Sequence, residues 1–312
     1  MSESRPDPEA ILRRLEWTVL RRLDGYLQGN YRTLFRGFGL DLADLREYQT
    51  HDDVRHIDWN VTARLQIPYV RQYNEDREIT AWFLLDMSPS MDFGSGEVTK
   101  RSVLTEFTAM IARVLTRHGN RVGALIYGGG VDTVIPPSTG RRHVLHILDA
   151  LTSRPEVAKA PPTDLSEFLR AALQIIHSRS FVFLISDFVS APGWASPLSM
   201  LGQRHEILAV RPFDPMEVEL PPLGLFLMQD SESGEQIFVD TTDRGFRKRF
   251  AHAAEQREFE VREGLSRAGV DAIELSTQDD IVDSVLRFTD MRKRRIRGSS
   301  ASRAAAVAGA AK

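Results

Sequence analysis

The stretch that decides the fold reads Ile79-Thr80-Ala81-Trp82-Phe83-Leu84-Leu85-Asp86-Met87-Ser88-Pro89-Ser90-Met91. It begins as an apolar run of strand length and ends that run in a carboxylate, Asp86. Ser88, Pro89 and Ser90 follow, and these are ordinary turn residues. A second apolar run, 180–187, ends in the same way in a hydroxyl and a carboxylate. We therefore predict two buried strands that carry polar side chains where they end.

Helical patterns alternate with these strands. Apolar residues recur at helical spacing from Val103 to Leu115 and again from Leu165 to Ile176. The other expected elements are strands at 121–127, 131–135, 206–211 and 271–275, helices at about 141–151, 243–267 and 279–290, and a hairpin at 225–229 and 236–239. Strands that alternate with helices in this way predict an α/β fold: an open, Rossmann-like sheet with helices on both faces.

The chain divides into three parts by pattern. Residues 1–78 hold an amphipathic helix over 8–27 and then a charge-rich region of short elements, an α+β extension that we expect to pack on the main domain. Residues 79–290 form the main α/β domain, with the hairpin inserted at about 212–242. Residues 291–312 are basic and then Ala-rich, which is typical of a disordered tail.

Composition narrows the class of protein. The 312 residues include 40 Lys and Arg against 43 Asp and Glu, so the chain lacks the basic excess of most nucleic-acid-binding proteins. The residues at the N-terminus do not form a signal peptide, and no apolar run approaches the roughly 20 residues of a membrane helix. We expect a soluble cytoplasmic protein. Because the chain has no cysteine, a metal site here must use oxygen or imidazole ligands.

Five oxygen-bearing side chains are candidates for such a site: Asp86, Ser88, Ser90, Thr163 and Asp187. Three lie at the turn after the first apolar strand, one follows the second strand, and Thr163 begins a helix. Carboxylates and hydroxyls are hard ligands that suit Mg²⁺ or Mn²⁺. A plainer interpretation makes the serines turn residues and Thr163 a helix N-cap. The placement of both carboxylates at strand ends favours the metal site.

Other chemistries have less support. The sequence has no phosphate-binding loop, no dinucleotide-binding glycine motif and no nucleophile elbow. A phosphatase of the haloacid-dehalogenase type needs a second aspartate where Ser88 stands. The eight histidines are scattered and do not suggest a metal site. A charged cluster beside Trp59 is typical of a structural ion-pair network rather than a catalytic site, and it comprises Asp52, Asp53, Arg55, Asp58 and Arg64.

Several longer motifs carry a resemblance to a known family. They are Arg46-Glu47-Tyr48-Gln49, Asp52-Asp53-Val54-Arg55, Ile57-Asp58-Trp59-Asn60, Thr62-Ala63-Arg64 and Asp86-Met87-Ser88-Pro89-Ser90-Met91. With these motifs the chain resembles the bacterial family DUF58, whose members contain a von Willebrand factor A-like (vWA) domain, over about residues 30–290. One position departs from the family pattern, since His51 stands where the family usually has glycine, and a different turn is expected there. Pro89, between the two serines, is expected to stiffen or distort the loop.

The resemblance implies a metal-ion-dependent adhesion site (MIDAS), with the motif falling directly on Asp86, Ser88 and Ser90 and by context on Thr163 and Asp187. Such domains bind proteins and are not enzymes, and the family is commonly encoded beside MoxR-type AAA+ ATPases. We therefore expect an adaptor whose Mg²⁺ captures an acidic residue of such an ATPase or its client. Two alternatives stay open. One is a metal-dependent hydrolase with Asp58 or Asp92 as its base, and the other is an interaction domain that has lost the ion.

Overall fold

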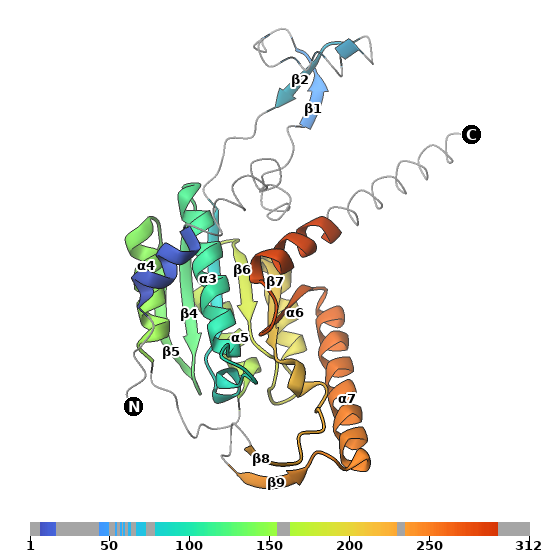
Figure 1. The fold of residues 1–312 in the computed structure, drawn as a ribbon. Helices are drawn as coiled ribbons and strands as arrows, with labels where there is room; N and C mark the ends of the chain where they lie inside the picture. The colour runs from blue at the N-terminus through green and yellow to red at the C-terminus, as the bar shows by residue number, and fades with distance from the viewer. Residues whose placement is uncertain are drawn as a thin grey trace, which may run out of the picture.

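A six-stranded sheet forms the centre of the chain in the computed structural model, which describes residues 7–16, 44–49, 54, 57, 59, 62–63, 67–72, 79–154, 163–229 and 235–292 (Figure 1). Its strands are β3 (Thr80–Asp86), β4 (Arg121–Tyr127), β5 (Val131–Ser138), β6 (Phe181–Ile185), β7 (Glu206–Phe213) and β10 (Asp271–Ser276). They lie in the order β10-β7-β6-β3-β4-β5. Every neighbouring pair is parallel except β4 and β5.

The central strands are apolar because both of their faces are covered. In β3 the side chains of Ala81, Phe83 and Leu85 enter one hydrophobic cluster, while Trp82 and Leu84 enter another. This alternation is the two-residue period of a strand, with apolar residues on both sides. The continuous apolar run in the sequence therefore follows from a strand buried between two helical layers.

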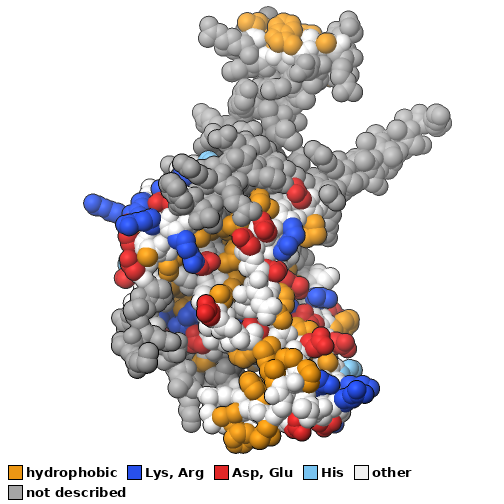
Figure 2. All heavy atoms as spheres, in the orientation of Figure 1, with side chains coloured by type: hydrophobic (Ala, Val, Ile, Leu, Met, Phe, Trp, Pro, Cys, Tyr) orange, Lys and Arg blue, Asp and Glu red, His pale blue; other side chains and the backbone are white. Residues whose placement is uncertain are grey.

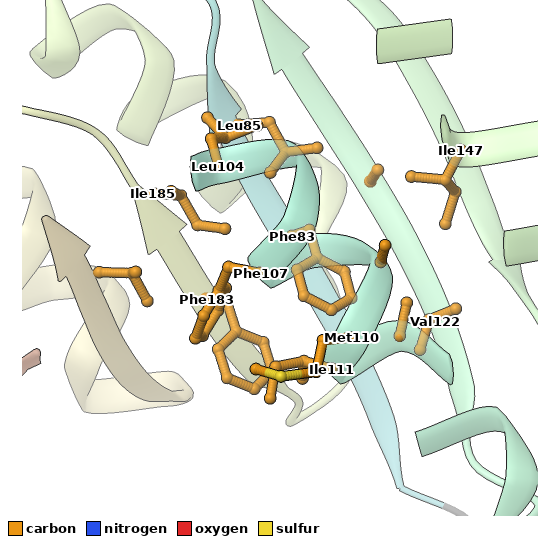
Figure 3. Close-up of a cluster of buried hydrophobic side chains, with 14 of the residues drawn as sticks. Phe83, Leu85, Leu104, Phe107, Met110, Ile111, Val122, Ile147, Phe183 and Ile185 are labelled. Atoms are coloured by element: carbon orange, nitrogen blue, oxygen red, sulfur yellow. The ribbon is translucent and has the colours of Figure 1, made fainter. Parts of the chain in front are cut away.

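Helices form those two layers. The first cluster includes residues of α3 (Lys100–Arg117), of α4 (Arg141–Thr152) and of the helices over 8–16 and 281–292. The second includes residues of α5 (Leu165–Ile175), α6 (Ala195–Arg204) and α7 (Arg244–Ala268). Figure 3 shows Phe83 and Phe183 from adjacent strands beside Phe107 of α3 in the first cluster. The predicted α/β sheet with helices on both faces is confirmed.

The helix over residues 8–16 packs on the outside of the first layer. Leu12 and Leu15 are buried in the cluster formed with α3 and α4. Glu9 pairs with Arg141 at 2.6 Å, and Glu16 accepts a hydrogen bond from Arg113 at 2.6 Å. The expected helix extends to residue 27, but residues 17–43 lie outside the described part of the chain.

Two short antiparallel pairs stand apart from the main sheet. One joins β1 (Asp44–Glu47) to β2 (Tyr69–Gln72). The other is the predicted hairpin, β8 (Leu225–Gln229) and β9 (Gln236–Asp240). Most apolar side chains of the hairpin are exposed: Leu225, Phe226, Leu227, Ile237 and Phe238. Figure 2 shows hydrophobic side chains gathered at the end of the molecule where Figure 1 places β8 and β9.

The edge strand β5 carries two consecutive prolines, Pro136 and Pro137. The pairing with β4 shifts register between Val122↔Ser138 and Ala124↔Ile135, so the prolines lie in a bulge. Proline cannot donate a backbone hydrogen bond, and edge strands and bulges are the positions in a sheet that tolerate it.

The structure differs from the sequence prediction in one main element. Helix α6 was not expected, because Pro197 and Ser196 near its start do not form a clear apolar stripe. The predicted charge cluster at Asp52, Asp53, Arg55, Asp58 and Arg64, the departure at His51 and the tail beyond residue 292 lie outside the described residues. Within the described part, no helix is both long enough and apolar enough to cross a membrane.

Candidate metal centre

The topology creates a crevice at the carboxyl end of β3. The chain leaves β3 for β4 on one side and later returns to β6 on the other side. In open α/β sheets such a switch point leaves a space beyond the strand ends, where ligands commonly bind. Asp86 is the last residue of β3, and Ser186 and Asp187 directly follow β6. The two predicted carboxylates therefore reach the same crevice.

Hydrogen bonds hold Asp86 between the two strand ends. Its Oδ2 accepts a hydrogen bond from the Ser186 hydroxyl at 2.7 Å, and its Oδ1 accepts one from the backbone N–H of Ser88 at 3.0 Å. The hydroxyl oxygens of Ser88 and Ser90 lie 3.1 Å apart. The turn after β3 thus places two hydroxyls and a carboxylate side by side, as the sequence predicts.

Pro89 fits this turn rather than distorting it. It occupies the first position of the short 3₁₀ helix η2 (Pro89–Asp92), and Ser88 precedes it as the N-cap in extended conformation. A proline is favoured at this position because the ring presets the backbone angle and no intrahelical N–H bond is lost. Pro89 is therefore compatible with a well-formed loop, and the expected distortion is not found.

Thr163 is brought to the same edge by the loop after β6. Its carbonyl oxygen accepts hydrogen bonds from Ala191 N and Ser190 Oγ, both at 3.0 Å, and its side chain is buried. The N-cap of α5 is Asp164, whose carboxylate accepts from Ser166 N and Glu167 N. The interpretation of Thr163 as the N-cap of the helix was wrong, because Asp164 is the N-cap.

A backbone outlier follows Asp187. Phe188 has a φ of 61°, the only positive value at a non-glycine residue among those described. Such a conformation costs about 1 kcal/mol or more for a residue with a bulky side chain. Phe188 is held there by a hydrogen bond from its N–H to Ser186 Oγ at 2.9 Å and by its ring against Trp194. The tight turn keeps Ser186 and Asp187 at the strand end.

The pKa values of the two buried carboxylates, Asp86 and Asp187, are shifted in opposite directions. Burial raises the pKa of Asp86 to about 6, and the charge of Asp187 adds to the shift. Burial also works against ionised Asp187, but the ammonium of Lys100 and the hydrogen bond from Val189 N together outweigh it, so the pKa of Asp187 is lowered. A further cation between the two carboxylates would relieve the repulsion that Asp86 experiences.

The sequence analysis missed Lys100 and Glu217. Lys100 Nζ donates to Asp187 Oδ2 at 2.7 Å and to Glu217 Oε1 at 2.6 Å. The lysine side chain is fully buried at the start of α3, while Glu217 lies in the short 3₁₀ helix η3 (Pro215–Glu217). Only one signal could have found Lys100: it lies on the same helical face as the apolar stripe that begins at Val103.

The donor set fits a small, hard cation. Asp86, Ser88, Ser90 and Asp187 offer carboxylate and hydroxyl oxygens. The described residues contain no group of three or more His, Cys, Asp or Glu arranged to hold a metal, so a site here depends on the hydroxyls. All five candidates are nearly inaccessible to solvent, with at most 4% of their surface exposed.

The hydrolase alternative has two candidate bases, Asp58 and Asp92, and the structure describes one of them. Asp92, in η2, accepts a hydrogen bond from Arg101 Nη2 at 2.9 Å, and the two side chains form an ion pair. Asp58 lies outside the described residues. Of these two residues, the structure therefore describes only Asp92, and its carboxylate is paired with Arg101.

Comparison with solved structures gives distant similarities. An aerotolerance-related membrane protein from Bacteroides fragilis is 12% identical, with a TM-score of 0.46, and the match covers 69% of this chain and 99% of that one. A von Willebrand factor type A protein from Catenulispora acidiphila is 10% identical, with a TM-score of 0.36, and the match covers 72% of this chain and 43% of that one.

Sequence comparison gives closer relatives. The uncharacterized protein Rv1480 of Mycobacterium tuberculosis is 37% identical over 289 residues, which cover 93% of this chain and 91% of the relative. The uncharacterized protein MAV169 of Mycobacterium avium is 31% identical over 162 residues, or 52% of this chain and 95% of the relative. The family model described as "Protein of unknown function DUF58" matches residues 44–260. The chain therefore belongs to the DUF58 family.

Proposed function

We propose that the protein is a non-enzymatic, metal-dependent interaction module of the MIDAS type. Asp86, Ser88, Ser90, Thr163 and Asp187 would hold Mg²⁺ or Mn²⁺, and the bound ion would accept a carboxylate from a partner protein. The observation that carries this proposal is the meeting of two strand-end carboxylates and two hydroxyls at the switch point of the sheet.

The surroundings of the crevice support a role in binding proteins. Phe93 and Val98, in the loop between η2 and α3, expose about two fifths of their surface. The hairpin of β8 and β9 adds further exposed apolar side chains at the end toward which the arrowheads of β4 and β6 point in Figure 1. Clustered exposed apolar groups commonly mark contact surfaces for other proteins. Because the candidate oxygen atoms are covered, a partner carboxylate needs the loops beside the crevice to open.

The partner we propose is a MoxR-type AAA+ ATPase or a client of that ATPase, as the family resemblance implies. The chain would then act as an adaptor in the assembly or activation of other proteins. Binding between the purified chain and the purified ATPase of the same organism should require a divalent ion and should be lost with EDTA. Equal binding with and without EDTA would leave an interaction domain that does not use the ion.

A metal titration tests the site itself. By calorimetry, Mn²⁺ should bind the wild-type chain with a stoichiometry of one. Asp86→Asn and Ser88→Ala should each weaken binding at least about tenfold, because the first removes a negative charge from the ligands and the second removes a ligand oxygen. Asp149→Asn on α4 and Ser196→Ala on α6 are matched controls, since both positions are exposed and belong to other surfaces.

Two outcomes would contradict the proposal. If the ligand variants and the controls titrate alike, Asp86 and Ser88 do not hold an ion. If the wild-type chain hydrolyses phosphoesters or peptides and Asp86→Asn abolishes that turnover, the hydrolase alternative replaces the interaction module.

A further inference from the structure

We propose that Lys100 is a resident cation of the candidate metal centre: it holds the Asp187 carboxylate when no metal ion is bound, and it thereby lowers the affinity of the site for divalent ions. The inference rests on the proposed metal site and adds a residue that sets how tightly the ion is held. Lys100 would be a positioning residue, since it acts on the ion through Asp187.

The contacts of Lys100 are those of a permanently buried charge. Its side chain has no exposed surface, and its ammonium lies 2.7 Å from Asp187 Oδ2 and 2.6 Å from Glu217 Oε1. Removing an ammonium from water is costly unless it gains close, hydrogen-bonded partners. Two carboxylates within hydrogen-bond distance meet that requirement, so the ammonium is stable where it lies.

Lys100 balances only part of the negative charge beside it. Its ammonium supplies one positive charge to two carboxylates, Asp187 and Glu217. Asp86 is a third buried carboxylate at the same strand ends, and its side chain is held by Ser186 and the backbone N–H of Ser88 rather than by Lys100.

Lys100 cannot easily withdraw when an ion arrives. Its stem leaves the first turn of α3 on the side of the buried residues Val103 and Leu104, and its ammonium is held between Asp187 and Glu217. An ion that uses Asp187 must therefore share this carboxylate with the ammonium. Two cations on one buried carboxylate repel each other strongly, because the surrounding dielectric is low.

Glu217 holds the other side of the ammonium in place. Its second oxygen, Oε2, accepts a hydrogen bond from Asp214 N at 3.0 Å. Asp214 Oδ2 in turn accepts from Ser95 N and Ser95 Oγ, both at 2.9 Å, and from Thr277 Oγ1 at 2.7 Å. The second partner of Lys100 is thus fixed to the loop before α3 and to the turn after β10. Because the ammonium is shared between two carboxylates, Glu217 weakens the interaction of Lys100 with Asp187, which favours the ion.

The test is an Mn²⁺ titration of the full chain by calorimetry, with wild type, Lys100→Met and Glu217→Gln. Lys100→Met keeps the length of the stem and removes the charge, so its dissociation constant for Mn²⁺ should fall at least about tenfold. Glu217→Gln leaves Lys100 with Asp187 as its one carboxylate partner and should raise the dissociation constant several-fold. Arg267→Met, exposed near the end of α7, is the control for loss of one positive charge and should change little.

The direction of the change separates this inference from a structural role. A lysine that only supports the fold would leave Lys100→Met binding Mn²⁺ equally or more weakly, and that result would overturn the inference while the metal site stands. If wild type binds no Mn²⁺ and Lys100→Met does, the inference holds and the proposed function of the wild-type chain fails. If no folded variant binds, both fail. Should Lys100→Met not fold, Lys100→Gln and Glu217→Gln carry the same comparison.

Discussion

Lys100 stands where the sequence pattern calls for an apolar side chain. It is followed at helical spacing by Val103, Leu104 and Phe107, which are buried on the same face of α3. A charged residue in phase with such a stripe indicates a buried ion pair. Its partners could not be read from the sequence, because Asp187 and Glu217 are 87 and 117 residues away along the chain. Asp86 and Ser88 could be predicted, since one short segment contains both.

A single-residue prediction concerns His205, the C-cap of α6 that directly precedes β7. Its ring is buried and Nδ1 accepts a hydrogen bond from Ser180 N at 3.3 Å, so the neutral ring is the form that fits. Burial lowers the pKa of His205, and the neighbouring charge of Arg204 adds to the shift. The unfolded chain therefore binds this proton more readily than the folded chain does. The histidine's contribution to stability is complete above pH 6.5, its ordinary value, and is lost as pH falls below it.

Chemical denaturation of wild type and His205→Gln at several pH values measures this effect. The glutamine can still accept from Ser180 N but does not titrate, so the stability of wild type relative to the variant should fall between pH 7.5 and about pH 5. A constant difference across that range would show that His205 does not titrate differently in the folded chain.

At the scale of elements, α6 shows where sequence patterns stop being informative. The apolar runs of β3 and β6 predicted strands because burial on both faces demands them. Helix α6 gave a weak signal, since Leu198 and Leu201 are its main buried apolar residues. Its place is fixed instead by tertiary contacts, in which Trp194 lies against Gly264 of α7. That glycine is in the interior of a 25-residue helix, where alanine would be the better helix former.

Alanine substitutions at two glycines test this contact. A Cβ at Gly264 would lie 2.5 Å from Cη2 of the Trp194 indole, whereas at Gly202 of α6 nothing is closer than 3.8 Å. Gly264→Ala should lower the free energy of unfolding by about 1–3 kcal/mol, because the buried indole must move. Gly202→Ala should raise it by up to about 1 kcal/mol through helix propensity. Thermal unfolding of both variants measures these changes. Equal melting temperatures would mean that the stability does not depend on the close contact between Gly264 and Trp194.

At the scale of the whole molecule, the strand order could not be derived from the alternation of elements alone. The pattern predicts helices on both faces, but many orders satisfy it. The order observed places β6 beside β3, and only this adjacency brings Asp187 to Asp86. The candidate site was predictable to the extent that both carboxylates follow apolar strands. Thr163 was predicted only from its place before a helix. Its position in the structure depends on hydrogen bonds that its carbonyl oxygen accepts from Ser190 and Ala191, which are far away in the sequence.

The helix over residues 8–16 should unfold together with the main sheet. Leu12 has no exposed surface and lies in the cluster that α3 and α4 cover. Leu12→Ala should therefore destabilise the whole chain by about 2–5 kcal/mol, since it leaves a cavity in a shared core. Arg13→Ala, exposed on the same helix, should change stability by less than about 0.5 kcal/mol. Urea unfolding followed by far-ultraviolet circular dichroism reports the loss of the helices and the sheet together. An unchanged midpoint for Leu12→Ala would mean that the helix detaches independently.

The prolines of β5 affect the tendency of the protein to aggregate at high concentration. A sheet ends in an unpaired row of backbone groups, and another chain can add a strand there. Pro136 and Pro137 offer no N–H, and the bulge around them bends this row out of register. This edge is therefore a poor template for strand addition. Replacing both prolines with valine or threonine would create an aggregation-prone edge without touching the crevice.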